Sequence, residues 1–164
     1  MAGCLPTAIP AIPAAGATVI LVSGPVAIPH PPGVQVVPVE TARAMLAAVE
    51  AALPADLAIF AAAVGDWRPA ETRASKIKKD GSAPAPLALV ENPDILAWIS
   101  RAEARPALVV GFAAETGDAQ KSALDYAQEK FARKGCDVLM ANEVGRGKTF
   151  GQKSNEGWIL RPDS

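Results

Sequence analysis

Residues 61–79 read AAAVGDWRPAETRASKIKK and join the end of an apolar run to a basic segment. Gly65 and Asp66 directly follow the apolar residues 57–64, and three lysines lie within residues 76–79. A buried strand that ends in Gly-Asp is typical of open α/β sheets, in which ligands bind beyond the carboxyl ends of the strands. Lysine offers a compact positive charge with three donors, so the segment indicates an anionic ligand such as a phosphate. On charge alone, a solvated lysine loop is the alternative.

The composition describes a chain of single-domain size without a global charge. It has 164 residues, of which 50% are hydrophobic and 5% aromatic, and its formal net charge is −1. A chain of this length can bury a core of its own, so we predict one domain over residues 1–164. The balanced charge provides no field that would attract nucleic acid or an anionic membrane surface, so any anion site must be local.

The few cysteines and histidines leave little material for a disulfide framework or a multi-histidine metal site. Cys4 and Cys136 are far apart and form no CxxC pair, and His30 is the only histidine. This usage fits the reducing cytoplasm. Residues 8–22 are strongly apolar, but prolines interrupt them and no lysine or arginine precedes Arg43. We therefore expect neither a signal peptide nor a membrane span there.

Short apolar runs alternate with helical patterns along the chain. Alternation of this kind favours βαβ units and a parallel sheet. We predict a three-layer, Rossmann-like α/β domain with an open, mostly parallel sheet, in which a continuously apolar strand is covered on both faces. The expected strands are 18–23, 34–39, 57–64, 107–113, 137–141 and 155–160, and the expected helices are 41–53, 92–104 and 116–134.

Several helix boundaries carry specific signals. Thr41 can cap the first helix, Asn92 with Pro93 can open the second, and Gly135 can end the third as a left-handed residue. Each interior proline costs about 3 kcal/mol in a helix. We therefore expect residues 1–16, which are rich in alanine and proline, to be irregular or broken.

Residues 70–91 have the character of a projecting arm. They are polar, lack an apolar face of their own and separate two well-formed core elements. Residues 86–91 can return antiparallel to residues 73–79. We predict that this arm projects from the body and packs on a second copy of the chain, so that two chains form a homodimer.

Polar or backbone-exposing residues lie at the ends of three predicted strands. They are Gly65-Asp66 after the third strand, residues 111–115 around the fourth and residues 141–143 after the fifth. The carboxyl ends of parallel strands gather along one edge, and the helix that begins near Asn92 presents free N–H groups to an anion. A GxGxxG or Walker A fingerprint is absent, which argues against a standard NAD site or a P-loop.

A series of motifs comes in a fixed order, and together they are far more specific than any one of them. The order is SGP at 23–25, AAVGDWRP at 62–69, KIKK at 76–79, NPDI at 92–95, GFAAET at 111–116, Lys130 with Lys134, and DVLMAN at 137–142. This pattern resembles the phosphopantothenoylcysteine synthetase domain of coenzyme A biosynthesis, which in bacteria is often fused behind a flavin decarboxylase. The resemblance covers roughly residues 14–160.

The resemblance implies a CTP-dependent ligase. In that family 4′-phosphopantothenate attacks the α-phosphate of CTP to form an acyl-cytidylate and pyrophosphate, and the amine of cysteine then displaces CMP. Mg²⁺ usually offsets the charge of the triphosphate, and no protein ligand for it is assigned here. By resemblance, Lys76 supports formation of the acyl-cytidylate, and the positions that match CTP binding are Phe60, Ala61, Ala62, Asp66, Asn92, Pro93, Asp94, Ile95, Phe112, Lys130 and Lys134.

The sequence departs from the family pattern near both ends. The family normally opens with a strand, a Gly-Pro-Thr turn and a loop of the type Ser-Asn-x-Ser-Ser-Gly-Lys-Met-Gly, whose asparagine is linked to the acyl-cytidylate step. Nothing before Ala14 resembles that loop, and the C-terminal helix of the family has no counterpart after Leu160. These departures predict a chain shortened at both ends, an incomplete gene prediction or a degenerate homologue.

Two alternatives to an active ligase stay open at this point. Without the loop, the chain can be a nucleotide-binding module that lacks catalysis. An NAD(P)-dependent reductase with a Rossmann-like sheet is the other alternative, and it would be expected to carry the glycine fingerprint that this sequence lacks. The residues alone do not choose between the ligase and the module, or between CTP and another nucleotide.

Overall fold

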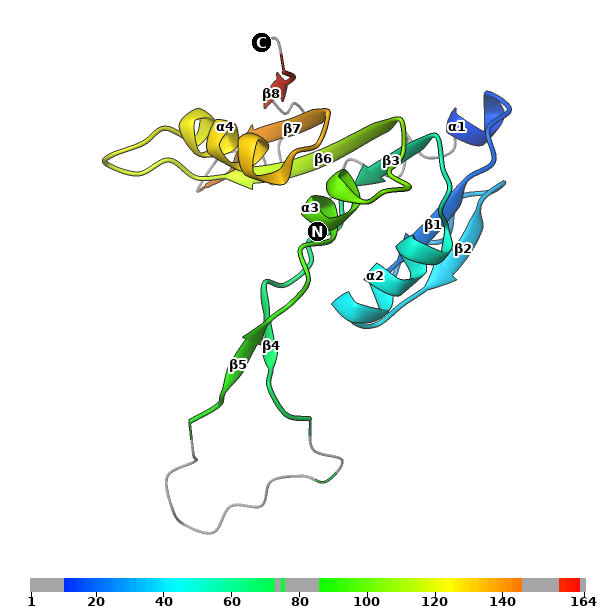
Figure 1. Ribbon diagram of the computed structural model, residues 1–164, viewed down its shortest axis with the longest axis horizontal. Helices are drawn as coiled ribbons and strands as arrows, with labels where there is room; N and C mark the ends of the chain where they lie inside the picture. Colours follow the sequence, from blue (N-terminus) through cyan, green and yellow to red (C-terminus); the bar gives the residue numbers. More distant parts are fainter. Residues whose placement is uncertain (1–10, 73–74, 76–85, 146–156, 163–164) are drawn as a thin grey trace.

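Figure 1 shows the computed structural model of the protein, which describes residues 11–72, 75, 86–145 and 157–162. The described residues form a four-stranded sheet, a parallel pair of strands and an antiparallel ribbon, together with helices. The helices are α1 (Ala11–Ala14), α2 (Ala42–Ala51), α3 (Ile95–Arg101) and α4 (Ala123–Lys134). The strands are β1 (Ile20–Ser23), β2 (Gln35–Pro38), β3 (Leu57–Phe60), β4 (Trp67–Pro69), β5 (Leu89–Glu91), β6 (Leu108–Glu115), β7 (Val138–Glu143) and β8 (Gly157–Leu160).

The four-stranded sheet forms the body of the protein and has the order β3-β6-β7-β8. Strands β3, β6 and β7 run parallel to one another, and β8 lies antiparallel to β7 at the edge. The central strand β6 spans eight residues, LVVGFAAE, with no proline and no charge before the last position. The predicted α/β class with parallel strands is confirmed.

The core lies on the face of this sheet that α3 and α4 contact. Val109 of β6 and Leu139 of β7 are fully buried there and meet Ile99 of α3 in one cluster. Gly111 of β6 leaves room for α3, because a Cβ there would lie only 2.6 Å from Cδ2 of Leu96 and the leucine would have to shift. The sequence of β6 therefore decides how tightly α3 can sit on the sheet.

The opposite face of the same sheet is open. Leu57 and Ile59 of β3 are 43% and 45% exposed, and Phe112 of β6 is 41% exposed. The register of the strands places on this same face three further exposed apolar residues, Leu108, Met140 and Ile159. The predicted strand over residues 57–64, covered on both faces, is therefore wrong in length and in burial. It ends at Phe60, and no described helix buries the side chains of Leu57 and Ile59.

Strands β1 and β2 form a separate parallel pair, against which α2 packs. Thr41 caps α2 as predicted, because its side chain accepts a hydrogen bond from the Ala44 N–H. Among the described residues no strand pairing joins this pair to the four-stranded sheet, and Ile20 of β1 is 41% exposed. The single three-layer sheet of a Rossmann-like domain is therefore not confirmed over the described residues.

The start of α3 differs from the prediction, in which Asn92 is the cap. Asp94 is the N-cap residue instead, and its side chain accepts a hydrogen bond from the Ala97 N–H. Asn92 instead donates from Nδ2 to the carbonyl of Gly65, and its Oδ1 accepts from Arg68. The helix also ends at Arg101, before the predicted end at residue 104.

The start of α4 was also predicted too early. Thr116 does not begin the helix, because Ser122 and Asp125 form a reciprocal capping box one and a half turns later. The residues between them make a turn in which Asp118 accepts hydrogen bonds from the N–H groups of residues 120 and 121. Gly135 ends the helix in the left-handed region, at φ 70°, as predicted.

Strands β4 and β5 form an antiparallel ribbon that leads away from the body (Figure 1). The pairing joins Trp67–Pro69 to Leu89–Glu91. Residues 89–91 return antiparallel, as predicted, but their partners are residues 67–69 and not the predicted residues 73–79. The middle of the arm, residues 73–74 and 76–85, lies outside the described residues, and its packing on a second copy stays a prediction.

One carboxylate ties the start of β6 to the start of β7. Oδ2 of Asp137 accepts hydrogen bonds from the Val109 N–H at 2.7 Å and from Nη2 of Arg105 at 2.6 Å. Burial raises the pKa of Asp137, but the two donors outweigh burial and lower the pKa from its ordinary value of 3.8. A lowered folded-state pKa contributes stability above the unfolded-state pKa, and this contribution disappears as the pH falls through the folded-state pKa.

We expect Asp137→Asn to lower the free energy of unfolding at pH 7 by about 1 kcal/mol, because the bonded carboxylate is one-third exposed and partly screened. The difference from the wild type should shrink as the pH falls below about 4, where the wild-type carboxylate becomes protonated. Urea unfolding at a series of pH values measures this, with the exposed Asp56→Asn as the matched control. A difference that stays constant down to acid pH would contradict the role of the charge.

Candidate functional site

The turn at Gly65 and Asp66 lies between the end of β3 and the base of the arm. Asn92, which returns from the arm, donates its backbone N–H to the Asp66 carbonyl at 2.8 Å. The Nδ2 group of Asn92 also donates to the Gly65 carbonyl at 2.7 Å. The side chain of Asp66 is exposed. The structure thus brings Asp66 and Asn92, two of the predicted site residues, side by side.

Arg68 completes this cluster. Its Nη1 donates to Oδ1 of Asn92 at 3.3 Å and also contacts the carbonyl of Glu91. No role was predicted for Arg68, although it lies inside the AAVGDWRP motif. The signal that could have found it is its place at the junction of turn and arm, where a guanidinium group with five donors can join several acceptors.

Asp94 links the start of α3 to the end of α4. Its Oδ1 accepts the capping hydrogen bond from the Ala97 N–H at 3.1 Å, and its Oδ2 accepts from Nζ of Lys134 at 2.5 Å. Burial raises the pKa of Asp94, but the bonds from Lys134 and Ala97 outweigh burial and lower the pKa below 3.8. Lys134 sits in the last turn of α4, so its long side chain carries a positive charge to the start of α3.

Lys130 and Glu115 form an ion pair where α4 meets the end of β6. The side chains are 29% and 15% exposed, respectively. Oε1 of Glu115 is fully covered, and its contact with Nζ of Lys130 satisfies the distance of an ion pair but not the geometry of a hydrogen bond. Glu115 was not predicted as a site residue. Its position at the end of a strand in the GFAAET motif is the signal that could have found it.

The three predicted residues at the end of β3 differ in their surroundings. Phe60 packs against the core, Ala61 is half-buried and Ala62 is exposed. The chain leaves the sheet after Phe60, so the two alanines form the connection to the turn at Asp66. They therefore belong to the segment that connects the core to the exposed carboxylate of Asp66.

The remaining predicted residues do not all come together. Pro93 is half-buried and Ile95 is buried at 5% exposure beside the cap of α3. Phe112 lies on the open face of β6, whereas Lys130 approaches the end of β6 from the helical face. Lys76 lies outside the described residues. The described site residues therefore lie on both faces of the sheet.

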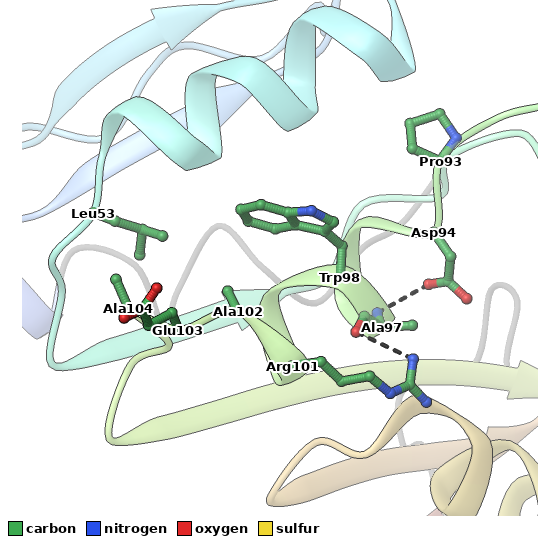
Figure 2. Close-up of a pocket in the computed structure, with 9 residues that line it drawn as sticks. All are labelled: Leu53, Pro93, Asp94, Ala97, Trp98, Arg101, Ala102, Glu103 and Ala104. Atoms are coloured by element: carbon green, nitrogen blue, oxygen red, sulfur yellow. Dashed lines mark hydrogen bonds between the residues drawn. The ribbon is translucent and has the colours of Figure 1, made fainter.

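A groove of about 630 Å³ runs beside α3 and is mostly apolar (Figure 2). Figure 2 shows Trp98 pointing away from α3 toward α2, with Pro93 and Asp94 at one end of the groove. Asp66 and Phe112 do not line it. The groove thus adjoins two predicted nucleotide residues but is not the whole predicted pocket.

Within the described ranges, no three side chains of histidine, cysteine, aspartate or glutamate come close enough to form a metal centre. The same ranges contain no helix with the length and apolar character needed to cross a membrane.

Comparison with known families gives these residues a context. Residues 7–164 match the family described as the C-terminal domain of DNA/pantothenate metabolism flavoproteins. The chain belongs to this family. The resemblance predicted from the order of the motifs is confirmed, because the match covers nearly the whole chain and includes every motif on which the resemblance rested.

Curated relatives of this family are longer proteins. The chain is 45% identical over 155 residues to the coenzyme A biosynthesis bifunctional protein CoaBC of Mycobacterium tuberculosis (strain H37Rv), an alignment that covers 90% of this chain and 37% of the relative. It is 42% identical over 134 residues to the protein of the same name in Escherichia coli (strain K12), with coverage of 80% and 32%. The chain therefore spans about a third of the length of these relatives.

Two solved structures of the family share the fold. One is the crystal structure of the C-terminal domain of a CoaBC protein, with 30% identity and a TM-score of 0.69, which covers 93% of this chain and 65% of that domain. The other is the DNA/pantothenate metabolism flavoprotein from Streptococcus pneumoniae, with a TM-score of 0.72 over 93% of this chain and 75% of the other. At 16% identity, the second likeness concerns the fold alone.

The double role of Asp94 as helix cap and ion-pair partner can be separated by substitution. We expect Asp94→Ala to lower the free energy of unfolding by about 1–2 kcal/mol, because the cap of α3 and the partner of Lys134 are both lost. Asp94→Asn should cost less, because an amide oxygen can still accept from the Ala97 N–H. Lys134→Met, which removes only the ion pair, should resemble Asp94→Asn in urea unfolding. Equal losses for the alanine and asparagine variants would mean that the cap contributes nothing.

Proposed function

We propose that this chain is a phosphopantothenate–cysteine ligase domain that uses CTP and acts in coenzyme A biosynthesis. The observation that carries the proposal is the alignment to CoaBC proteins over 80–90% of this chain. Support from the geometry comes from Lys130 and Lys134, which α4 directs to the end of β6 and the start of α3. Cationic groups at these places suit a triphosphate, whose charge has to be offset during phosphoryl chemistry.

Each of the two lysines is held by a carboxylate and can also pair with a phosphate. Glu115 holds Lys130 and Asp94 holds Lys134, so both ammonium groups are oriented before a ligand arrives. A phosphate oxygen, like a carboxylate oxygen, can form an ion pair with an ammonium group or accept a charge-assisted hydrogen bond from it. In the proposed site the phosphates share these lysines with the two carboxylates, and the exposed carboxylate of Asp66, the turn at residues 92–95 and the ring of Phe112 contact the rest of CTP.

The proposed reaction has two steps. A carboxylate oxygen of 4′-phosphopantothenate attacks the α-phosphorus of CTP, the bond to the β-phosphate breaks, and pyrophosphate leaves. The amine nitrogen of cysteine then attacks the acyl carbon, CMP leaves, and the nitrogen loses a proton as the amide forms. Lys76 is assigned to the first step, where a positive charge near the reacting oxygens stabilises the charge that develops in the transition state.

The surroundings of the reaction follow from the same proposal. Mg²⁺ enters with CTP, bound by phosphate oxygens, and offsets part of the triphosphate charge. The enzyme works in the cytoplasm, joined to or associated with a flavin decarboxylase, and the arm over residues 70–91 packs on a second copy to form a homodimer. The proposed fold is a three-layer, Rossmann-like domain in which the open face of β3-β6-β7-β8 is covered, as is usual for parallel sheets.

A nucleotide-binding module that lacks catalysis is the second candidate. The observation that favours it is that no Ser-Asn-x-Ser-Ser-Gly-Lys-Met-Gly motif occurs in the sequence. Nucleotide binding and turnover must therefore be measured separately, because only turnover distinguishes the two candidates.

We expect CTP with Mg²⁺ to bind more tightly than ATP with Mg²⁺ in isothermal titration. Asp66→Ala should weaken CTP binding by about tenfold or more, because the exposed carboxylate at the strand end is a proposed contact. Asp56→Ala is the matched control, since Asp56 precedes β3 whereas Asp66 follows it. Equal affinity for both nucleotides, or equal effects of the two substitutions, would refute the proposed pocket.

For turnover, we expect this chain to release pyrophosphate very slowly from CTP, phosphopantothenate and cysteine, because the family loop is not in the sequence. A fusion that adds a family-type N-terminal segment should recover turnover, and Lys76→Ala in that fusion should lower the rate by about 10²–10³. Lys79→Ala, in the same basic segment, serves as the control. Full activity without the added segment would show that the loop is dispensable, and full activity after Lys76→Ala would remove Lys76 from the mechanism.

A further inference from the structure

The polar groups of Asn92 are directed toward the Gly65–Asp66 turn and Arg68. The backbone N–H donates to the Asp66 carbonyl at 2.8 Å, Nδ2 donates to the Gly65 carbonyl at 2.7 Å, and Oδ1 accepts from Nη1 of Arg68 at 3.3 Å. Both ends of the side-chain amide are therefore engaged within the protein. Nδ2 keeps its second N–H and Oδ1 its second lone pair, so these contacts orient the amide without using all of its hydrogen-bonding capacity.

The turn depends on these contacts for its shape. Strand β3 ends at Phe60 and β4 begins at Trp67, so residues 61–66 belong to no strand. Among the described residues, the two bonds from Asn92 are the hydrogen bonds that hold residues 61–66. Asp66, the proposed contact to CTP, thus projects from a segment that one residue on the returning side of the arm secures.

Arg68 fixes the orientation of that residue. Its Nη1 contacts the Glu91 carbonyl as well as Oδ1 of Asn92, which places the oxygen of the amide toward Arg68 and the nitrogen toward Gly65. Only an amide of this length offers an acceptor on one side and a donor on the other. An aspartate at position 92 could still accept from Arg68, but it would direct a negative oxygen at the carbonyl of Gly65.

We propose that Asn92 and Arg68 are positioning residues, which hold the Gly65–Asp66 turn in the shape that binds the nucleotide. This inference rests on the proposed function for its consequence in CTP binding. The geometry also couples the arm to the site, because Arg68 lies in β4 and Asn92 directly follows β5. A displacement of the base of the ribbon therefore moves the turn that carries Asp66.

The first experiment tests the clamp without any ligand. The backbone amide of residue 92 is protected by its bond to the Asp66 carbonyl, so its hydrogen-exchange rate by NMR reports opening of the turn. Arg68→Ala leaves Asn92 in place and should raise this rate by about tenfold, whereas Arg68→Lys, which keeps one donor, should raise it less. Arg43→Ala, on the exposed side of α2, is the control. An unchanged exchange rate in Arg68→Ala would overturn the proposal.

The second experiment tests whether Asn92 acts through Asp66. Asn92→Asp should weaken CTP binding by about tenfold in isothermal titration, and Gln35→Glu, the same chemical change at an exposed position of β2, should have no effect. In the Asp66→Asn background the effect of Asn92→Asp should largely disappear, because the contact that Asn92 positions is already lost. Arg68→Ala should show the same dependence on Asp66.

The outcomes separate this inference from the function on which it rests. An equal loss of CTP affinity with and without Asp66 would make Asn92 a direct ligand and overturn the inference. A wild-type chain that binds no CTP would refute the proposed function, and the exchange experiment would still decide whether the clamp exists. If Asn92→Asp fails to fold, Arg68→Ala and Arg68→Lys carry both experiments, with rescue by lysine as the expected result and no difference between them as the contrary one.

Discussion

Close packing of α3 and α4 on one face of β6 and β7 is the constraint on which the rest of the structure depends. Leu96 packs against the sheet where Gly111 has no side chain, and Val109 and Leu139 are fully buried beneath the helices. This packing also sets the distance between the start of α3 and the last turn of α4. The ion pair of Asp94 with Lys134, and with it the charge at the candidate site, follows from an apolar contact.

The charges of the site are arranged in pairs rather than as a free basic patch. Lys130 and Lys134 project from α4 on successive turns. Lys130 pairs with Glu115 of β6, and Lys134 pairs with Asp94, the N-cap residue of α3. Such pairing reduces the cost of keeping partly buried lysines charged. Ligand affinity would then depend on how much more strongly each lysine interacts with the ligand than with its carboxylate. The carboxylates are therefore as important for specificity as the lysines.

Features that depend on residues close together in the sequence were predicted correctly. Features that depend on contacts between distant residues were not. The Gly135 terminus, the Thr41 cap and the parallel strands β3, β6 and β7 follow from local signals and apolar runs. The cap of α3 could not be predicted, because two candidates two residues apart, Asn92 and Asp94, have similar capping preferences. In the structure the side chain of Asn92 contacts Gly65 and Arg68, which lie across the base of the arm, and Asp94 caps the helix.

The order of the motifs identified the family, yet it did not show which residues act directly and which act through a neighbour. Arg68 and Glu115 lie inside quoted motifs and received no role, because their partners are distant in sequence. Phe112 and Lys130 were assigned to one pocket from resemblance, and the described residues place them on opposite faces of β6. Strand register alone could not have revealed this, since it fixes the face of Phe112 but not the direction from which a helix approaches.

The open face of the four-stranded sheet has a consequence for how the protein behaves in solution. Large apolar side chains from all four strands are presented to water there, including Ile59, Phe112 and Ile159. Their hydration is unfavourable, and salts such as sulfate, which are excluded from protein surfaces, increase that cost. Where this face is left uncovered, its apolar surface favours association, and a net charge of −1 gives little electrostatic repulsion between molecules. An uncovered face would make the protein salt out at lower concentrations of sulfate than a covered one.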